Sequence, residues 1–350
     1  MDQQNFIIYA LTSQGAKLGH RLAEQISAQL WLPRQLAPEY QAQGFDALMA
    51  AVAANFSLYS AQIFICATGI VVRAIAPYLQ DKTQDPAVLV LDQEGRYCVS
   101  LLSGHLGGAN ALTLQISRIL GAEPVISTAT DSAGIQAVDL LAQNKDLHIA
   151  NPKALAAVNS ALLQSAPLQV FDPLDRLDLA KKEQKGYYPQ QVSSARDWNS
   201  QQPGIWVQEA ARLSNLRQDL HLQLIPRSLV LGLGCNRGTS GQEILELILQ
   251  NLIKQNLSLT SIAALASIQA KSDEPGLIQA AYSLKVPLEF VSSEEIGQVQ
   301  TPNPSKAVFA HMGVYSVCEA AAMIKARSSK LLMAKTKSKN ATLAIARREP

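Results

Sequence analysis

Residues 97–116 read YCVSLLSGHLGGANALTLQI. The apolar run at 97–102 is typical of a strand, and the spacing of apolar residues from Ala111 to Ile116 is typical of a helix. Between them lies a loop, 103–110, that is rich in glycine. A strand that passes through a short loop into a helix is the repeating unit of α/β proteins, so this stretch predicts an α/β fold.

The same loop carries groups that suit a functional site. Gly104, Gly107 and Gly108 permit positive φ angles and leave backbone N–H groups accessible. The N–H groups at the start of the following helix add partial positive charge, and His105 titrates near neutral pH. The loop therefore predicts a place that holds an anionic group and moves a proton beside it. A packing turn with a solvated histidine is the alternative.

Polar loops adjoin three other predicted strands. Ala67-Thr68-Gly69 follows one strand, Asp81–Pro86 precedes a second, and Ser127–Asp131 follows a third. In an open parallel sheet, the loops at the carboxyl ends of the strands gather at one edge and form the ligand crevice. We therefore expect these loops to meet the His105 loop at a single edge.

The wider pattern predicts a multi-domain α/β protein. Alternating strands and helices run from a strand at 6–11 and a helix at 16–30 to about residue 143, which predicts a mostly parallel sheet in an N-terminal domain, 1–143. A middle region, 144–226, carries a polar insertion near 172–202 and short strands, on one of which His221 is expected to be exposed. A separate C-terminal α/β domain spans 227–350.

Composition narrows the class of partner. The chain has 350 residues, is 48% hydrophobic and carries a formal charge of only +2, which favours a globular protein over a bulk polyanion binder. Basic residues nevertheless crowd the last part of the chain, where a solvated surface, a patch for a polycarboxylate and a nucleic-acid site are the alternatives. No aromatic residues alternate with these cations in the way that stacks bases, so we expect no nucleic acid.

Cysteine and histidine usage gives no sign of a metal site. The four cysteines form no CxxC pair and the five histidines show no ligand spacing, so no resident metal is expected. We also find no signal peptide and no apolar stretch of membrane-spanning length, which predicts a cytoplasmic protein without a membrane partner.

A second glycine loop follows the predicted strand at 229–233. Its spacing is G-x-G-x-x-x-G over 232–238, and no acidic residue follows at the distance that a dinucleotide site requires, so a nicotinamide role is disfavoured. Anion capture is the alternative, because Arg237 and the N–H groups of the next helix suit a carboxylate.

These motifs, in this order, resemble the CbiG family, the cobalt-precorrin-5A hydrolases of anaerobic cobalamin biosynthesis. The resemblance is carried by Gly69–Arg73, Asp81-Lys82, Asp85–Val88, Leu101–Asn110, Thr128–Asp131, Gly232–Thr239, Lys271–Leu277, Gly313–Ala321 and the segments 331–337 and 341–346. It spans nearly the whole chain and is weakest in the middle. Asn236 departs from the basic residue expected in many relatives, which leaves Arg237 as the only cation in its loop.

The resemblance implies a reaction. Water opens the δ-lactone of cobalt-precorrin-5A, and a two-carbon fragment leaves as acetaldehyde to give cobalt-precorrin-5B. The cobalt arrives inside the tetrapyrrole, so no separate cofactor is expected, and the partners are the cobalt-corrinoid intermediate and other enzymes of the pathway. The main alternative is a non-catalytic corrinoid carrier, and release of acetaldehyde would distinguish the hydrolase from such a carrier. A tetrapyrrole methyltransferase is a weaker alternative, because the sequence shows no cofactor motif for it.

Lactone opening needs an activated water, a stabilised oxyanion and a protonated leaving oxygen. The candidate catalytic residues are His105, Asp131, Asp85 and Lys82, with Gly104, Gly107 and Gly108 as oxyanion donors. We expect His105 to be neutral, because a helix N-terminus disfavours imidazolium. Each aspartate has the alternative role of a loop or helix cap.

By the same analogy, the N-terminal domain holds the hydrolytic groups and the C-terminal domain holds the corrinoid. The candidate substrate-binding residues are Gly69, Arg73, Ser103, Gly104, Gly107, Gly108, Asn110, Thr128, Thr130, Cys235, Arg237, Lys271, Glu274, Glu319 and Lys335.

Overall fold

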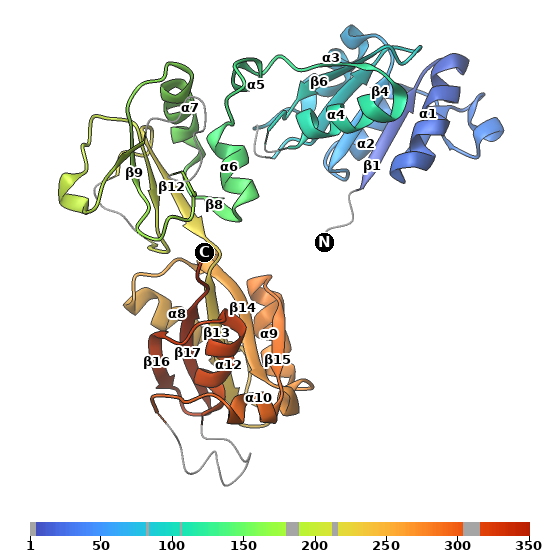
Figure 1. Cartoon of the computed structure of the whole chain (residues 1–350). Coiled ribbons are helices and arrows are strands. Elements are labelled where there is room, and N and C mark those ends of the chain that lie inside the picture. Colours follow the sequence, from blue (N-terminus) through green and yellow to red (C-terminus); the bar gives the residue numbers. More distant parts are fainter. Residues whose placement is uncertain (1–4, 82–83, 106, 180–188, 212–215, 304–315) are drawn as a thin grey trace. The chain divides into compact units, whose positions relative to one another are not determined.

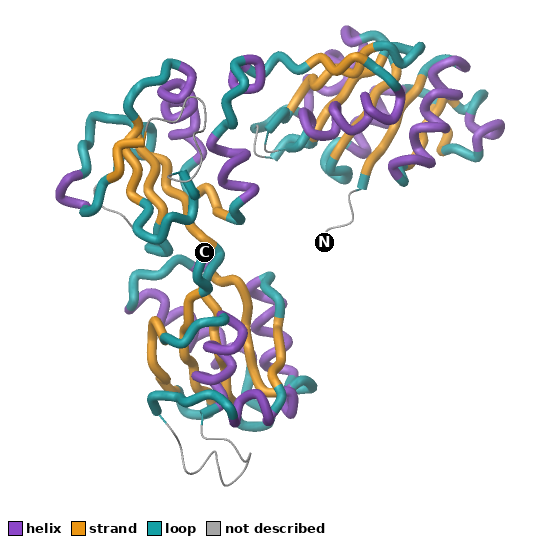
Figure 2. Tube along the Cα trace, viewed as in Figure 1, coloured by secondary structure: helices purple, strands orange, loops and turns teal. Residues whose placement is uncertain are grey.

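A computed structural model describes residues 5–81, 84–105, 107–179, 189–211, 216–303 and 316–350. The chain divides into two compact units, 1–140 and 141–350 (Figure 1). Among the described residues, unit 1 holds one seven-stranded sheet and unit 2 holds two five-stranded sheets. Figure 2 draws the strands in orange.

The sheet of unit 1 is mostly parallel, with strand order β3-β2-β1-β4-β5-β6-β7 in the described part of the chain. Each neighbouring pair is parallel except β5 and β6. The strands are β1 (Phe6–Ala10), β2 (Gln29–Pro33), β3 (Gln43–Phe45), β4 (Ala61–Ile65), β5 (Ala87–Leu91), β6 (Tyr97–Leu102) and β7 (Glu123–Val125). The helices are α1 (Ser13–Ile26), α2 (Leu48–Asn55), α3 (Thr68–Ile75), α4 (Ala109–Leu120), α5 (Ala129–Ser132) and α6 (Val138–Asn144), the last of which continues into unit 2.

Helices cover both faces of this sheet. Because side chains alternate along a strand, Ile8 packs with α1 and α4 on one face, whereas Ile7 and Tyr9 pack with α2 and α3 on the other. Strands buried on both faces explain the nearly continuous apolar runs of β1, β4 and β5.

In unit 2, the described strands of the middle sheet follow the order β10-β9-β11-β12-β8, with β12 and β8 antiparallel. These strands are β8 (Leu147–Ile149), β9 (Leu168–Phe171), β10 (Pro189–Gln191), β11 (Gly204–Val207) and β12 (His221–Pro226), and the helix is α7 (Leu155–Leu163). The predicted irregular insertion therefore contains a short strand, β10, which pairs with β9.

The C-terminal sheet has the order β15-β14-β13-β17-β16 over its described strands. They are β13 (Leu229–Cys235), β14 (Ile262–Ile268), β15 (Leu288–Val291), β16 (Leu331–Lys337) and β17 (Ala341–Arg347), with helices α8 (Gly241–Lys254), α9 (Pro275–Leu284), α10 (Ser293–Gly297) and α12 (Val317–Ala326). Helices α8 and α9 pack on one face and α12 on the other. Gly232 allows this close packing, because an added Cβ would overlap the Cys318 carbonyl oxygen and lie 2.8 Å from Ala322 N.

Two predictions about local structure are wrong. The helix expected at 16–30 ends at Ile26, because Ser27 adopts the left-handed conformation (φ 54°) and the N–H of Ala28 returns to Ala23 O; Leu30 instead lies on β2. His221 is fully buried rather than exposed. Its Nδ1 accepts hydrogen bonds from Arg217 N (2.9 Å) and Trp198 Nε1 (3.3 Å), and burial is the main cause that lowers its pKa.

Candidate functional site

The direction of β6 decides which loops meet. Strand β6 runs antiparallel to β5, and β7 runs parallel to β6. The loops that come after β6 and β7 therefore lie at the end of the sheet where β5 begins. Ser103 Oγ donates to Asp85 O (2.9 Å), just before β5. Gly69 and Arg73 lie on α3, which leaves the opposite edge of the sheet, where Arg73 Nη1 donates to Gly69 O (2.9 Å). The expectation of one shared edge is therefore wrong for Gly69 and Arg73.

Two carboxylates face the two ring nitrogens of His105. Nε2 lies 2.8 Å from Asp131 Oδ2 on α5, and Nδ1 lies 3.3 Å from Asp139 Oδ2 on α6. Thr130 Oγ1 is 3.3 Å from Nε2. We call His105, Asp131 and Asp139 the His105 group. Sequence reasoning missed Asp139, and its only signal was an acidic residue in the first turn of a helix, which is ordinarily a cap.

The three side chains of the His105 group differ in their exposure to solvent. The side chain of Asp139 is 8% exposed, that of His105 is 11% exposed, and that of Asp131 is 34% exposed. The hydrogen bond to Asp139 is the main cause that raises the pKa of His105, and Asp131 adds to it. Burial alone would raise the pKa of Asp139, but the bond and charge of His105 outweigh it and lower that pKa. The two carboxylates thus shift the pKa of His105 upward, which is opposite to the direction expected from the helix N-terminus.

Asn110 links the two loops. Its Nδ2 donates to Thr128 Oγ1 (2.9 Å) and Asp131 Oδ2 (3.0 Å), and its Oδ1 accepts from Ser100 Oγ (2.6 Å). Gly104 must lack a side chain here, because an added Cβ would lie 2.7 Å from Asn110 Oδ1. Asn110 therefore fixes the position of Asp131 from the start of α4.

Gly107 and Gly108 shape the turn after His105. Gly108 has φ 83° and its N–H donates to His105 O (2.9 Å), so it is not available as the predicted oxyanion donor. Gly107 must also be small, because an added Cβ would overlap the Ser103 side chain. The turn holds His105 at the start of α4.

Asp85 has the alternative role that the sequence left open. Its carboxylate accepts two contacts from Gln80 N, at 3.0 and 3.2 Å, as a loop cap does. Lys82 lies outside the described residues.

The ion pairs of His105 predict a pH window of stability. A raised His105 pKa adds stability that is fully present below the ordinary value of 6.5 and is lost as pH rises through the raised value. A lowered Asp139 pKa adds stability that is present above 3.8 and is lost as pH falls through the lowered value. We expect the difference in melting temperature between the wild type and His105→Asn to be largest between these limits.

Calorimetry across pH measures this difference. His20→Asn is the control, because His20 pairs with Glu24 on the exposed surface of α1 (3.6 Å). A difference that is flat with pH, or equal to that of the control, would contradict the assigned ion pairs.

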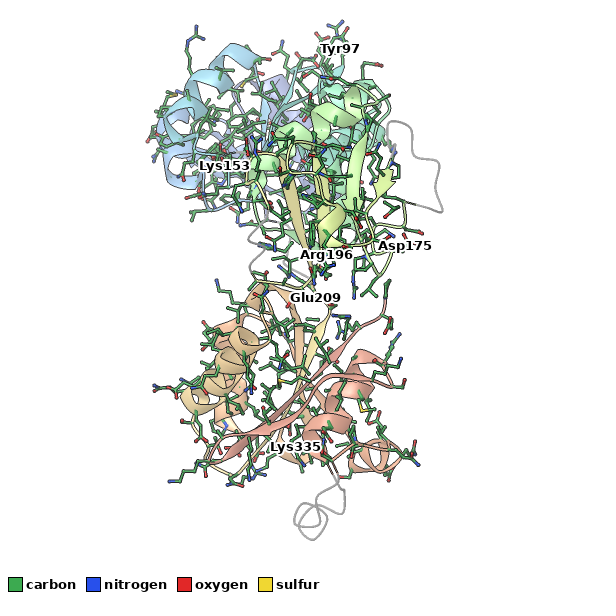
Figure 3. All side chains as sticks on the ribbon, turned by 90° about the vertical axis from the view of Figure 1, so that its left-hand side faces the viewer. Tyr97, Lys153, Asp175, Arg196, Glu209 and Lys335 are labelled. Atoms are coloured by element: carbon green, nitrogen blue, oxygen red, sulfur yellow. The ribbon has the colours of Figure 1, made fainter. Side chains whose placement is uncertain are left out.

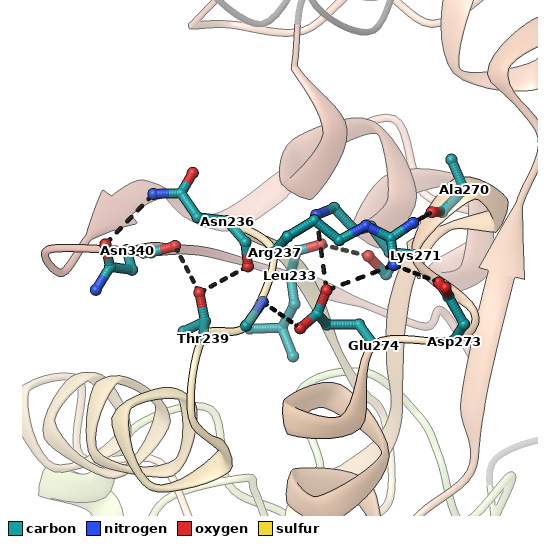
Figure 4. Close-up of polar contacts among 11 residues, drawn as sticks. Leu233, Asn236, Arg237, Thr239, Ala270, Lys271, Asp273, Glu274 and Asn340 are labelled. Carbon is teal, nitrogen blue, oxygen red and sulfur yellow. Dashed lines mark hydrogen bonds and ion pairs between the residues drawn. The ribbon is translucent and has the colours of Figure 1, made fainter.

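In the C-terminal domain, cations and acids gather after β13 and β14 (Figure 4). Arg237 Nη1 lies 2.6 Å from Asp273 Oδ1, and Nη2 donates to Ala270 O (2.9 Å). The buried Glu274 carboxylate accepts from Gly238 N (2.8 Å) and lies 3.8 Å from both Arg237 Nη1 and Lys271 Nζ. The exposed guanidinium is thus already paired inside the protein. Hydrogen bonding to Arg237 is also the main cause that lowers the pKa of Asp273.

Cys235 ends β13 beside this cluster, and burial is the main cause that raises the pKa of its thiol. The thiol therefore stays protonated at neutral pH and is a poor nucleophile.

Glu319 supports the same edge of the sheet from inside. Its fully buried carboxylate accepts from Asn303 N (3.1 Å), Asn303 Nδ2 (2.8 Å), Ser316 Oγ (3.2 Å) and Lys335 N (3.0 Å). Burial alone would raise its pKa, but these bonds lower it. Lys335, labelled in Figure 3, donates from Nζ to Asn303 O (2.9 Å). In this structure Glu319 has no surface to offer a substrate, contrary to its predicted binding role.

The described residues contain neither a metal-binding cluster nor a membrane-spanning helix. No group of three or more His, Cys, Asp or Glu residues is placed there to hold a metal ion. Within the same ranges, no helix combines the length and apolar character needed to cross a bilayer.

Comparison with known proteins covers nearly the whole chain. The chain matches three family descriptions: Cobalamin synthesis G N-terminal over residues 50–131, Cobalamin biosynthesis central region over 136–226 and Cobalamin synthesis G C-terminus over 229–346. The solved structure of a cobalamin biosynthesis protein G homolog from Sulfolobus solfataricus covers 99% of this chain and 98% of its own, at 21% identity and a TM-score of 0.38.

Two relatives carry the same name. A cobalt-precorrin-5A hydrolase from Priestia megaterium is 30% identical over 98% of this chain and 94% of its own length. A cobalt-precorrin-5A hydrolase from Salmonella typhimurium strain LT2 is 34% identical over 92% of each chain. The match extends through the His105 loop, the middle sheet and the Arg237 cluster in their order along the sequence. The chain belongs to the CbiG family of cobalamin-biosynthesis proteins.

Proposed function

We infer that this protein is a cobalt-precorrin-5A hydrolase, which opens the δ-lactone of its substrate and releases the two-carbon unit as acetaldehyde. The full-length relatives of that name support the activity. The observation that supports its location in unit 1 is the 2.8 Å contact between His105 Nε2 and Asp131 Oδ2. A histidine and a carboxylate at this distance form an acid–base pair of the kind that hydrolysis needs.

The exposure gradient suggests how the roles divide. Asp131 is the most exposed member of the His105 group, so it is the member that meets water and takes its proton as the water oxygen attacks the lactone carbonyl carbon. His105, in its imidazolium form, donates a proton to the lactone ring oxygen when the lactone C–O bond breaks. The alcohol that this opening creates then loses its proton, and its oxygen becomes the aldehyde carbonyl as the C–C bond between the two-carbon unit and the macrocycle breaks. The electron pair of that bond stays on the macrocycle, which takes up a proton. One water is consumed, acetaldehyde and cobalt-precorrin-5B are formed, and no external oxidant or reductant is required.

The substrate brings its own cobalt, and we propose no resident cofactor. Its carboxylate groups suit the Arg237 and Lys271 cations and the loop at the start of α8, in the C-terminal domain. In this proposal unit 1 supplies acid–base groups and the C-terminal domain supplies binding. Asp85 and Glu319 hold loops in place rather than touching the substrate.

The test of the activity is to incubate the protein with cobalt-precorrin-5A and measure acetaldehyde. We expect repeated turnover, with one acetaldehyde formed for each cobalt-precorrin-5B. Binding of the intermediate without acetaldehyde would instead identify a corrinoid carrier. The double variant His105→Asn with Asp131→Asn is the control for spontaneous opening of the lactone.

We also predict how Arg237, Lys271 and Asp273 affect the affinity for the substrate. Arg237→Ala and Lys271→Ala are expected to weaken corrinoid binding, with a larger effect at low salt, because exposed charges are less screened there. Asp273→Asn is expected to strengthen binding, because it removes the acid that occupies Arg237 at 2.6 Å. Equilibrium titration of the coloured corrinoid at two salt concentrations measures both effects.

A matched exposed pair provides the control for these binding measurements. Arg34 and Asp46 lie 2.6 Å apart in unit 1, and both side chains are exposed. Arg34→Ala and Asp46→Asn are expected to leave affinity unchanged. Equal affinity in all variants would remove the Arg237 cluster from the substrate site.

A further inference from the structure

We propose that Asp139 is a positioning residue for this reaction: it holds the Nδ1 side of the His105 ring, so that Nε2 faces Asp131 and the reacting groups. This inference rests on the proposed hydrolase function and deepens it. Asp139 is not one of the residues that carry the family resemblance in the sequence, and it reaches the ring from α6, whereas Asp131 reaches it from α5.

The two carboxylates differ in what surrounds them. Asp139 is 8% exposed and its Oδ2 lies 3.3 Å from Nδ1, so it meets the ring from the protein interior. Asp131 is 34% exposed and is also held by Asn110 Nδ2 at 3.0 Å. A substrate that enters from solvent therefore meets Asp131 before His105, and Asp139 is shielded behind the ring.

A carboxylate behind the ring settles which nitrogen exchanges protons. When Nδ1–H points to Asp139, any proton that the ring gives or takes on the substrate side passes through Nε2. The proton that leaves Nε2 goes to the departing oxygen, and it is replaced from the Asp131 side, where water delivers a proton in each cycle. Asp139 keeps its charge throughout and touches no reacting atom.

An ordinary helix cap does not account for this arrangement. Asp139 Oδ1 accepts from the N–H of the next residue, Leu140 (3.2 Å), whereas a capping side chain accepts from an N–H two or three positions further along the helix. The second oxygen, Oδ2, is directed to His105. A cap needs one acceptor, whereas Asp139 uses its two oxygens for two different partners.

The first experiment measures the ring itself, independently of activity. His105 is one of five histidines, so its C2–H signal in the proton NMR spectrum is assigned by its absence from the His105→Asn spectrum. In the described residues, the charged groups that face this ring are Asp131 and Asp139. We expect Asp139→Asn to lower the midpoint of His105 titration and to change its tautomer signal, because the amide retains an acceptor but loses the charge.

The control is Asp92→Asn. Asp92 follows β5 at the opposite edge of the same sheet, where its carboxylate accepts from Tyr97 N (2.8 Å) and Glu94 N (3.3 Å). We expect it to leave the His105 titration unchanged. A His105 titration that is the same in wild type, Asp139→Asn and Asp92→Asn would overturn the proposal.

The second experiment measures turnover. We expect Asp139→Asn to lower kcat by about 10- to 100-fold, the range typical when a group that orients a functional histidine is lost, with KM unchanged and the alkaline limb of the pH profile moved to lower pH. A variant with wild-type kcat and an unmoved pH limb would overturn the positioning role even if the NMR shift is present. Failure of the proposed function looks different, because the wild type itself would then release no acetaldehyde while the NMR result stands.

Discussion

Replacement of His105 by alanine or asparagine is expected to lower the rate of acetaldehyde release by about 10²–10⁴-fold, the usual contribution of a general acid–base group. Alanine removes the ring that both carboxylates face, and asparagine keeps a hydrogen-bonding side chain without proton transfer. Rates of acetaldehyde formation under single-turnover conditions isolate the chemical step from product release. Near-normal release by both variants would leave Asp131 as the remaining candidate.

His105→Ala is also expected to destabilise the folded protein. Alanine leaves the nearly buried Asp139 carboxylate without its cation, which costs about 1–3 kcal/mol. The side chain is therefore less dispensable for folding than an isolated loop residue would be. The rate comparison should be made below the melting temperature of each variant, and the loss of rate in His105→Asn is the more direct measure of chemistry.

Gly232→Ala is expected to destabilise the C-terminal domain by about 3 kcal/mol or more, because overpacking against backbone cannot be relieved by a rotamer change. The new Cβ would overlap the Cys318 carbonyl oxygen and would lie 2.9 Å from Ala322 Cβ. Helix α12 would have to lift from β13, which exposes the alanine-rich face that packs on the sheet. Calorimetry of the full chain would show a lower transition temperature, with loss of corrinoid binding.

Gly297→Ala is the matched control for this variant. Gly297 is exposed at the end of α10, and an added Cβ would find no atom within 4 Å. Alanine there should be neutral or slightly stabilising, because it lowers the conformational entropy of the unfolded chain. If both variants melted at the same temperature, the close packing of α12 on β13 would be wrong.

Much of the local structure was predictable from sequence. The strand β1 matches the strand predicted at 6–11, and β13 contains the strand predicted at 229–233, because strands buried on both faces leave continuous apolar segments. The sequence also predicted that the loop of Asp131 meets the loop of His105, and the two side chains lie 2.8 Å apart.

The direction of β6 was not predictable in the same way. An apolar run is the same whether the strand runs up or down the sheet, so the local pattern does not say at which edge its loop emerges. Because of that ambiguity, we incorrectly predicted that Gly69 and Arg73 lie at the same edge of the sheet as His105. Asp139 was missed for a related reason, since its role depends on where α6 lies in space and not on a spacing along the chain.

The contacts of the His105 group have a consequence for how the site forms. These contacts join residues that are close in sequence: 26 residues separate His105 from Asp131, and 18 separate Asn110 from Thr128. Contacts close in sequence cost little loop-closure entropy and form early in folding. The group also lies wholly within residues 1–140, the first compact unit. As domains fold in order during synthesis, the acid–base centre can assemble on the ribosome before the C-terminal sheet has been translated.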